Sequence, residues 1–218
     1  MSTWLFPREA YTIYMKQYTP FVITFILSTL TALIILNLYH TNQTSEEALR
    51  AHYYTSQVAT LESPHGIRKA ISKGNDSFIL VDVRSQQEYE QEHIVGAYSI
   101  PVYKDPDTSN YDDEERIVRD FRELKEANPE KKIIIYCYSG SCMSGRKVGK
   151  MLAESDIFVK ELGIGWNEWR YDWSMWNYPH EWNITAVEDY VVGGADPGTF
   201  AGIDELPEGC SANRDLGC

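Results

Sequence analysis

Hydrophobic and polar residues follow three different patterns along the chain, and the first is an uninterrupted apolar run near its start. Residues from Phe21 to Tyr39 include no charged side chain. A helix of that length reaches about 28 Å at about 1.5 Å per residue, which is enough to cross the hydrocarbon core of a bilayer. The pattern predicts one transmembrane helix over residues 20–40, between an N-terminal segment (1–19) and a linker (41–62).

Two other interpretations of the apolar run are a buried core helix and a cleaved signal peptide. The run shows no amphipathic face, the segment before it is long, and no small-x-small cleavage site follows it, so the sequence favours an uncleaved anchor. Arg8 and Lys16 precede the run, whereas the charges after it are mixed. Because cytoplasmic flanks carry the excess of Lys and Arg, we expect a single-pass membrane protein with its soluble domain on the extracytoplasmic side.

The second pattern, over residues 63–183, alternates short apolar runs with amphipathic helical stretches. Apolar runs bounded by polar residues are typical of strands covered on both faces, and they occupy residues 77–83, 97–102, 131–138 and 157–162. Helical spacing of apolar residues occupies residues 63–74, 85–93, 112–128, 144–155 and 165–176. This alternation predicts an α/β fold with a parallel sheet and helices on both faces, in which chemistry lies beyond the carboxyl ends of the strands.

Local signals mark two of the predicted helix starts. Ser63 stands before Pro64, which suits the first helical position, and Gly74 suits the position after the helix end. Ser85 and Glu88 have the spacing of a capping box, in which each side chain bonds the other residue's backbone.

The third pattern, over residues 184–218, lacks periodicity and carries many more acidic than basic residues, together with Gly and Pro. Such a composition predicts an acidic, loosely ordered tail. Cys210 and Cys218 could close a small disulfide there if the domain lies outside the cytoplasm.

Composition narrows the possible partners. The 218 residues carry a formal net charge of -12, which argues against nucleic acid as a partner. Four cysteines are too few for a disulfide scaffold in a chain of this length, and neither close pair has the Cys-x-x-Cys spacing of zinc sites. The sequence therefore predicts no metal and no other cofactor.

One cysteine lies at a position that is typical of catalytic nucleophiles. Cys137 ends a predicted buried strand, and a Gly- and Ser-rich turn follows it. If a helix begins near Cys142, unpaired backbone N–H groups and the helix N-terminus form a cradle for negative charge. A thiol there is expected to have a lowered pKa and to act as a nucleophile. The alternative is a structural cysteine buried at a strand end.

Three stretches of this zone resemble the rhodanese family. "FILVDVRSQQEYEQEHIVGAYSIPV" is similar to the first half of a rhodanese domain, with its Asp-x-Arg strand end, its Glu-Tyr helix and its His-Ile-x-Gly-Ala-x-x-Ile-Pro segment. "KKIIIYCYSGSCMS" resembles the active-site strand and loop, and "ELGIGWNEW" resembles the Leu-x-Gly-Gly-x-x-x-Trp signature after the last strand. The motifs stand in the family's order and cover about residues 63–179.

The resemblance implies a rhodanese-like domain over residues 63–183 that moves sulfane sulfur from a small-molecule donor to a thiol or another thiophilic acceptor. It implies that Cys137 is the nucleophile, cycling between thiolate and persulfide. The loop that holds the outer sulfur would consist of Tyr138, Ser139, Gly140, Ser141 and Cys142. Asp82 and Arg84 match the family's Asp-x-Arg, which we interpret as an ion pair that braces the loops near the pocket. A direct role of Arg84 in substrate binding is the alternative.

The loop departs from the family at Cys142, because common rhodanese loops carry an arginine at this position, five residues after the nucleophile. A dianionic donor such as thiosulfate would miss that cation. Cys142 could attack a Cys137 persulfide, with release of sulfide and formation of a disulfide. It could instead protect Cys137 from over-oxidation as a reversible disulfide, or fill space as a small apolar residue.

Three functions therefore compete. The leading one is a membrane-anchored rhodanese-like sulfurtransferase that works through a Cys137 persulfide. The second is a dithiol–disulfide redox protein that uses Cys137 and Cys142. The third is a non-catalytic binding module of the same fold. The intact Cys137 argues against this third function. A phosphatase of this fold is excluded, because its loop needs the spacing Cys-(x)5-Arg and no arginine stands there.

Four tryptophans recur at helical spacing and form one stripe: Trp166, Trp169, Trp173 and Trp176. We expect this stripe to pack against the sheet and the neighbouring helices, with a membrane-facing aromatic belt as the alternative.

Overall fold

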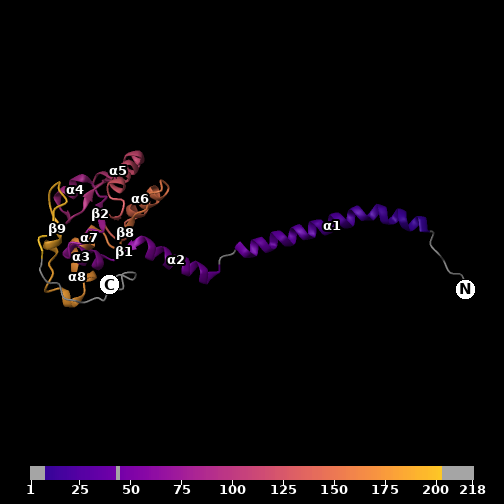
Figure 1. The fold of residues 1–218 in the computed structure, drawn as a ribbon, viewed down its shortest axis with the longest axis horizontal. Helices are drawn as coiled ribbons and strands as arrows, with labels where there is room; N and C mark the ends of the chain where they lie inside the picture. Colours follow the sequence, from indigo (N-terminus) through magenta and orange to yellow (C-terminus); the bar gives the residue numbers. More distant parts are fainter. Residues whose placement is uncertain (1–7, 43–44, 203–218) are drawn as a thin grey trace. The chain divides into compact units, whose positions relative to one another are not determined.

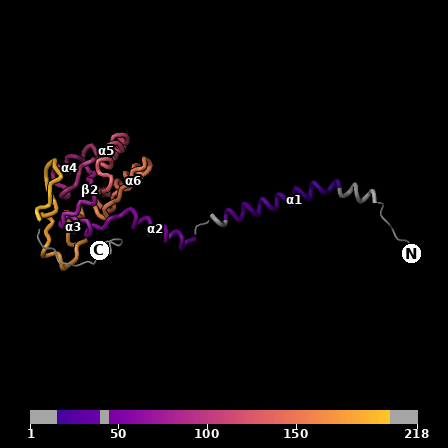
Figure 2. The backbone as a smooth tube through the Cα atoms, viewed as in Figure 1, coloured from indigo at the N-terminus to yellow at the C-terminus, as the bar shows by residue number. Residues whose placement is uncertain are grey.

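A computed structural model describes residues 8–42 and 45–202 of the chain (Figure 1). The chain forms two compact units, Met1–Tyr54 and Thr55–Cys218, which are described separately. Figure 2 traces the backbone of both units as a tube coloured along the sequence.

The first unit is dominated by one long apolar helix, α1 (Arg8–Asn42), with Pro20 inside it. Its stretch Lys16–Tyr39 is long and apolar enough to cross a membrane, and none of its most apolar window is buried in the structure. The predicted N-terminal apolar helix is confirmed. Length and composition fit a membrane anchor and a signal sequence equally.

A second helix, α2 (Glu46–Thr60), lies within residues 41–62, which the sequence predicts to be a linker. Ser45 caps it by accepting a hydrogen bond from the Ala48 amide. Glu46 forms an ion pair with Arg50 one turn later. The stretch contains no Gly or Pro, so the local preferences are helical although no residue of α2 is buried.

The second unit is built on a parallel sheet of five strands in the order β1-β8-β7-β2-β4, and every neighbouring pair is parallel. This confirms the predicted α/β fold. The strands are β1 (Leu61–Glu62), β2 (Phe78–Asp82), β4 (Tyr98–Ser99), β7 (Lys132–Tyr136) and β8 (Lys160–Leu162). The longest strands, β2 and β7, are adjacent, and their register pairs Asp82 with Tyr136. Both strands therefore end at the same point of the carboxyl edge.

Helices cover both faces of the sheet, because strand side chains alternate between two apolar cores. Ile135 lies in one core with Phe121 of α5 and Leu152 of α6. Ile134 lies in the other core with Trp169 of α7. The helices of this unit are α3 (Pro64–Ser72), α4 (Gln86–Gln91), α5 (Glu114–Ala127), α6 (Met143–Ala153), α7 (Trp166–Tyr171) and α8 (Trp173–Trp176).

The predicted helix starts are confirmed. Ser63 caps α3 through the Gly66 amide, and Pro64 is its first residue. Ser85 and Glu88 form a capping box at the start of α4. Short elements complete the unit: the hairpin β5 (Tyr103–Asp105) and β6 (Thr108–Ser109), the pair β3 (His93–Ile94) and β9 (Val191–Val192), and the 3-10 helices η1 (Pro179–Glu181) and η2 (Val187–Tyr190).

The tryptophan stripe packs inside the domain, although the helix predicted over residues 165–176 is divided in two at Asp172. Trp169 is fully buried. Its ring stacks on Trp176 with 4.9 Å between centroids and meets Trp173 edge to face at 5.8 Å.

The region predicted to be a loosely ordered tail differs from that prediction in its first part. Tyr190 is fully buried, and its ring lies 5.3 Å from Trp173 and 4.8 Å from Phe200. Strand β9 pairs with β3, so Val191 lies opposite Ile94. The reason is that a few apolar residues of this region pack in the second core. A sequence without periodicity does not reveal such contacts. The possible disulfide between Cys210 and Cys218 lies outside the described residues.

Candidate active site

The carboxyl edge of the sheet brings the predicted site residues together. Cys137 directly follows β7, and Asp82 ends the neighbouring strand β2. The Val83 amide donates to the Tyr136 carbonyl, which continues the pairing beyond the strand ends. The loop of residues 138–142 then leads into α6, whose N-terminal cap residue is Cys142.

Two sulfur atoms form the centre of the site. The Sγ atoms of Cys137 and Cys142 lie 3.1 Å apart, and both cysteines are free. A disulfide bond would measure about 2.05 Å, so this is a close non-bonded contact. Cys137 is buried, with 3% of its surface exposed, whereas Cys142 is only partly buried. One sulfur is thus enclosed and the other borders the surface.

The pKa values of the two thiols move in opposite directions. Burial raises the pKa of Cys137 far above its ordinary value, and the neighbouring Cys142 sulfur raises it further. Partial burial acts to raise the pKa of Cys142 as well, but the Ser144 hydroxyl, the Cys137 sulfur and the Ser144 and Tyr138 amides lower it overall. The two sulfur atoms are in contact, so the thiols titrate as an interacting pair.

This differs from the sequence prediction, which assigns the lowered pKa to Cys137. The fully buried position of Cys137 at the strand end outweighs the donors around it. Cys142 at the first turn of α6 receives the same donors with less burial. Of the two thiols, Cys142 is therefore the one that loses its proton more readily.

Ser144 is a site residue that the sequence analysis missed. Its side chain is buried, and its hydroxyl lies 2.6 Å from Tyr103 Oη and accepts a hydrogen bond from Tyr111 Oη. The same hydroxyl acts on both cysteine sulfurs and lowers the pKa of each. A serine two residues after the second cysteine, in the first turn of a predicted helix, is the signal that could have identified it.

The loop amides are less open than the sequence predicts. The Gly140 amide donates to the Glu168 carboxylate, at 3.2 and 3.3 Å from its two oxygens, and the Cys142 amide donates to the Ser139 carbonyl at 2.9 Å. The Tyr138 and Ser144 amides act on the sulfur atoms. The cradle at the sulfur pair thus consists of two amides and one hydroxyl, while Glu168 occupies part of the predicted ring.

Glycines let the loop lie against the turn that follows β8. A Cβ atom on Gly165 would lie 2.2 Å from the Ser139 nitrogen, and one on Gly140 would lie 3.0 Å from the Gly163 carbonyl oxygen. The amides of Trp166 and Asn167 donate to the carbonyls of residues 137 and 138. The start of α7 therefore holds the cysteine loop in place through backbone contacts.

Asp82 and Arg84 form the predicted ion pair, with 2.7 Å between Arg84 Nη2 and Asp82 Oδ2. Arg84 Nε also donates to both oxygens of this carboxylate. Arg84 Nη2 donates to the Glu92 carbonyl, and the guanidinium lies 4.3 Å from the Trp166 ring centroid. These contacts are those of a bracing residue.

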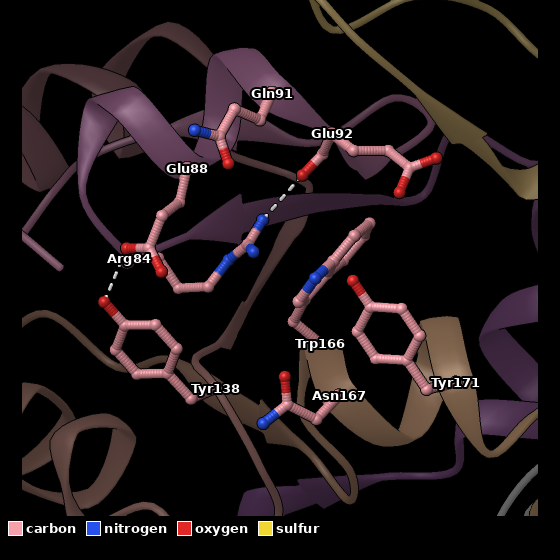
Figure 3. Close-up of a pocket in the computed structure, with 8 residues that line it drawn as sticks. All are labelled: Arg84, Glu88, Gln91, Glu92, Tyr138, Trp166, Asn167 and Tyr171. Carbon is pink, nitrogen blue, oxygen red and sulfur yellow. Dashed lines mark hydrogen bonds between the residues drawn. The ribbon is translucent and has the colours of Figure 1, made fainter.

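Arg84 also lines a cavity of about 370 Å³ beside the loop (Figure 3). Tyr138 reaches this cavity, where its hydroxyl donates to Glu88 at 2.6 Å. The other residues that line the cavity are Gln91, Glu92, Trp166, Asn167 and Tyr171. Its wall is polar, with acidic groups beside the one arginine.

Arg146 is the first arginine after the nucleophile, and it does not replace the missing loop cation. Its guanidinium contacts Glu161, the Met143 sulfur and the Gly140 carbonyl. In the described part of the chain, no group of three or more His, Cys, Asp or Glu side chains is placed to hold a metal ion.

Residues 63–172 match the family model described as "Rhodanese-like domain". The chain is 27% identical over 115 residues to a thiosulfate sulfurtransferase, GlpE, from Coxiella burnetii, covering 52% of this chain and 86% of that one. It is 30% identical over 91 residues to an HTH-type transcriptional regulator from Mycobacterium tuberculosis, of which it spans 34% of the length.

Among solved structures, a protein from Bacillus halodurans is similar with a TM-score of 0.44 and 28% identity, covering 58% of this chain and 82% of that one. A structure described as rhodanese with anions, from E. coli, is similar with a TM-score of 0.27 and 24% identity, covering 39% of this chain and 84% of that one.

Proposed function

This chain belongs to the rhodanese-like domain family, and from that premise we propose that it is a sulfurtransferase that carries sulfane sulfur as a persulfide of Cys137. The observation that carries the proposal is the position of Cys137 at the carboxyl end of the central strand β7, in contact with a second sulfur. The similarity to a thiosulfate sulfurtransferase supports a sulfane-sulfur donor of that kind.

The sulfur pair supplies the nucleophile. Loss of the Cys137 proton leaves a Cys137 thiolate, 3.1 Å from the Cys142 sulfur. This thiolate attacks the sulfane sulfur of thiosulfate, the sulfur–sulfur bond of the donor breaks, and sulfite leaves with the electron pair. The product is a Cys137 persulfide anion. The Tyr138 amide and the Ser144 hydroxyl, which favour a negative charge on Cys137, stabilise it.

The second half of the reaction regenerates the enzyme. A thiolate acceptor attacks the outer sulfur of the persulfide and becomes a persulfide itself. Cys137 leaves as a thiolate, which restores the starting nucleophile. Asp82 and Arg84 hold the adjacent strand end and Trp166 in place through this cycle, and Tyr138, Ser139, Gly140, Ser141 and Cys142 form the loop.

The test is sulfur transfer from thiosulfate to cyanide by the full chain in detergent micelles, with thiocyanate as the product measured. We expect activity that Cys137→Ser abolishes. The double variant Cys210→Ser/Cys218→Ser, which changes the same residue type outside the loop, should retain it. Thiocyanate production that survives Cys137→Ser would refute the assignment of the nucleophile.

A dithiol–disulfide redox function is the second candidate, because the two sulfur atoms are close enough to form a disulfide with little movement. It predicts two-electron oxidation and reduction of the pair without any sulfane-sulfur donor. Under this candidate, Cys142→Ser abolishes activity as fully as Cys137→Ser. Transfer to cyanide that survives Cys142→Ser would favour the sulfurtransferase.

We also propose that residues 20–40 form an uncleaved single-pass anchor, with the domain over residues 63–183 on the extracytoplasmic side. The apolar stretch Lys16–Tyr39 and the basic residues before it support this. The chain should stay in the membrane fraction after alkaline carbonate extraction and keep its N-terminal residues. A mature protein that begins after residue 40 would show a signal sequence instead.

A further inference from the structure

We propose that Cys142 is a second catalytic residue: it attacks the Sγ atom of a Cys137 persulfide, releases hydrosulfide, and leaves a Cys137–Cys142 disulfide. This inference rests on the proposed persulfide of Cys137. It adds a reductive activity, in which the sulfane sulfur leaves as sulfide when no acceptor thiol takes it.

The geometry favours attack on the inner sulfur of the persulfide. Reacting atoms in productive ground states lie about 3–3.5 Å apart, and the Cys142 Sγ lies 3.1 Å from the Cys137 Sγ before any sulfur is loaded. The inner sulfur of the persulfide is this same Cys137 Sγ atom. Cys142 therefore faces its target without a rearrangement of the loop.

The leaving groups favour the same atom. Attack on the outer sulfur would expel the Cys137 thiolate, whose basicity burial raises. Attack on the inner sulfur expels hydrosulfide, a less basic leaving group than an alkyl thiolate. Disulfide exchange is faster when the leaving sulfur is the less basic one.

The attacking sulfur is also the more anionic one. The Ser144 hydroxyl and the Ser144 and Tyr138 amides favour a thiolate at Cys142. In the persulfide state these donors favour a negative charge on Cys142 once its proton passes to the outer sulfur. They hold its charge in the first turn of α6, where the helix N-terminus adds to the stabilisation.

The step balances. The Cys142 thiol passes its proton to the outer sulfur of the persulfide anion, and the resulting Cys142 thiolate attacks the Cys137 Sγ atom to give disulfide plus hydrosulfide. The two thiol sulfurs are thereby oxidised and the sulfane sulfur is reduced by two electrons. A dithiol reductant must restore the pair. It attacks the partly exposed Cys142 sulfur, the Cys137 thiolate leaves, and the second thiol of the reductant closes its own disulfide and frees Cys142.

The experiment uses a single turnover of the full chain in detergent, in a Cys210→Ser/Cys218→Ser background so that only the loop cysteines remain. The protein is reduced, freed of reductant, and mixed with thiosulfate or 3-mercaptopyruvate without an acceptor. Released sulfide and the intact mass of the protein are measured. We expect one equivalent of sulfide per loaded chain and a protein lighter by two hydrogen atoms. Added dithiothreitol should make sulfide release catalytic.

Cys142→Ser is the decisive variant. We expect it to release no sulfide and to retain a mass increase of one sulfur atom on Cys137, which cyanide removes as thiocyanate. If chains with an intact Cys142 also retain that extra sulfur and release no sulfide, the inference is wrong while the proposed sulfurtransferase stands. If neither donor loads the Cys142→Ser chain, the proposed function itself fails. Cys142→Ala tests whether the serine hydroxyl disturbs the loop, and we expect the same persulfide to persist.

Discussion

The carboxylate of Glu168 accepts a hydrogen bond from the backbone amide of Gly140, at 3.2 Å, inside the loop that carries the two cysteines. The same carboxylate accepts the Gly165 amide at 2.9 Å. The negatively charged Glu168 therefore binds a loop amide that the sequence analysis expects to bind an incoming anion. Since the family's loop arginine is also absent, the local charge works against anionic sulfur donors.

Replacing Glu168 by glutamine should improve the use of thiosulfate. The amide oxygen can still accept from Gly140 and Gly165, but the charge is gone. We expect the KM for thiosulfate to fall about three- to tenfold, because a nearby like charge contributes on the order of 1 kcal/mol in a partly solvated site. Glu123→Gln, the same change at an exposed position on α5, should leave the KM unchanged. If the KM for thiosulfate is as unchanged in Glu168→Gln as in Glu123→Gln, Glu168 does not oppose binding of the donor.

Removing the Ser144 hydroxyl should shift the pH dependence of Cys142. The pKa of Cys142 is lowered in the folded protein, so alkylation by iodoacetamide should rise and reach its plateau below the range of an ordinary thiol, about 8.5. In Ser144→Ala the curve should move to higher pH. Below its midpoint the rate should fall about tenfold, since a hydrogen bond to a charged group contributes about 1.5–3 kcal/mol.

The control for Ser144 is Tyr111→Phe, which removes one hydroxyl that bonds Ser144 but keeps the serine. Its alkylation curve should move less than that of Ser144→Ala. Mass spectrometry after partial alkylation identifies which cysteine reacts. Identical curves for the natural chain and Ser144→Ala would contradict the role given to this hydroxyl.

Gly165→Ala should disrupt the cysteine loop. The new Cβ atom would fall 2.2 Å from the Ser139 nitrogen, and that neighbour is backbone. We expect a loss of about 1–3 kcal/mol in the free energy of unfolding, measured by chemical denaturation, together with loss of thiocyanate formation. Gly149→Ala is the matched control, because its Cβ would meet only Val159, at 4.0 Å. Inside helix α6 this change should be neutral or stabilise by about 0.5–1 kcal/mol.

Glu181→Gln, a change away from the candidate site, should destabilise the domain. The buried Glu181 carboxylate lies 2.7 Å from both His65 Nε2 and Arg68 Nη2. Removing one member of a buried charge cluster costs about 3–5 kcal/mol. Denaturation at neutral pH measures this loss, and Glu123→Gln should change stability by less than about 0.5 kcal/mol.

The pH dependence of stability gives a second check on Glu181. Burial acts to raise the pKa of Glu181, but His65 and Arg68 lower it overall. Its stabilising contribution is therefore present above the unfolded pKa of about 4.3 and is lost as the pH falls through the lower folded value. Glu181→Gln should lack this part of the acid-induced loss. Parallel stability curves for both chains would contradict it.

Much of the fold follows from periodicity. The runs that became β2 and β7 alternate between two apolar cores, and the caps at Ser63 and Ser85 fix where α3 and α4 begin. Strands β3 and β9 have two residues each, which is too short for any periodic signal. They exist because backbone pairing and the burial of Tyr190 hold them, and such long-range contacts are invisible in local sequence.

Only the part of the site that one continuous stretch of the chain forms was predictable from the sequence. The position of Cys137 after a buried run, and the closeness of Cys142, follow from the turn between strand and helix. Glu168 and Tyr103 reach the loop from other elements, so no local pattern marks them. The direction of the pKa shift at Cys137 also depends on packing from both sides, which spacing does not give.

The aromatic stack around Tyr190 has a practical consequence for work on an isolated domain. The family match ends at residue 172, yet Tyr190 is fully buried in the second core with Ile94 and Trp169, and β9 pairs with β3. A fragment that ends at residue 172 would expose to water the apolar surface that Tyr190 covers, and it would be prone to aggregate. Expression plasmids for this domain should therefore extend past Phe200.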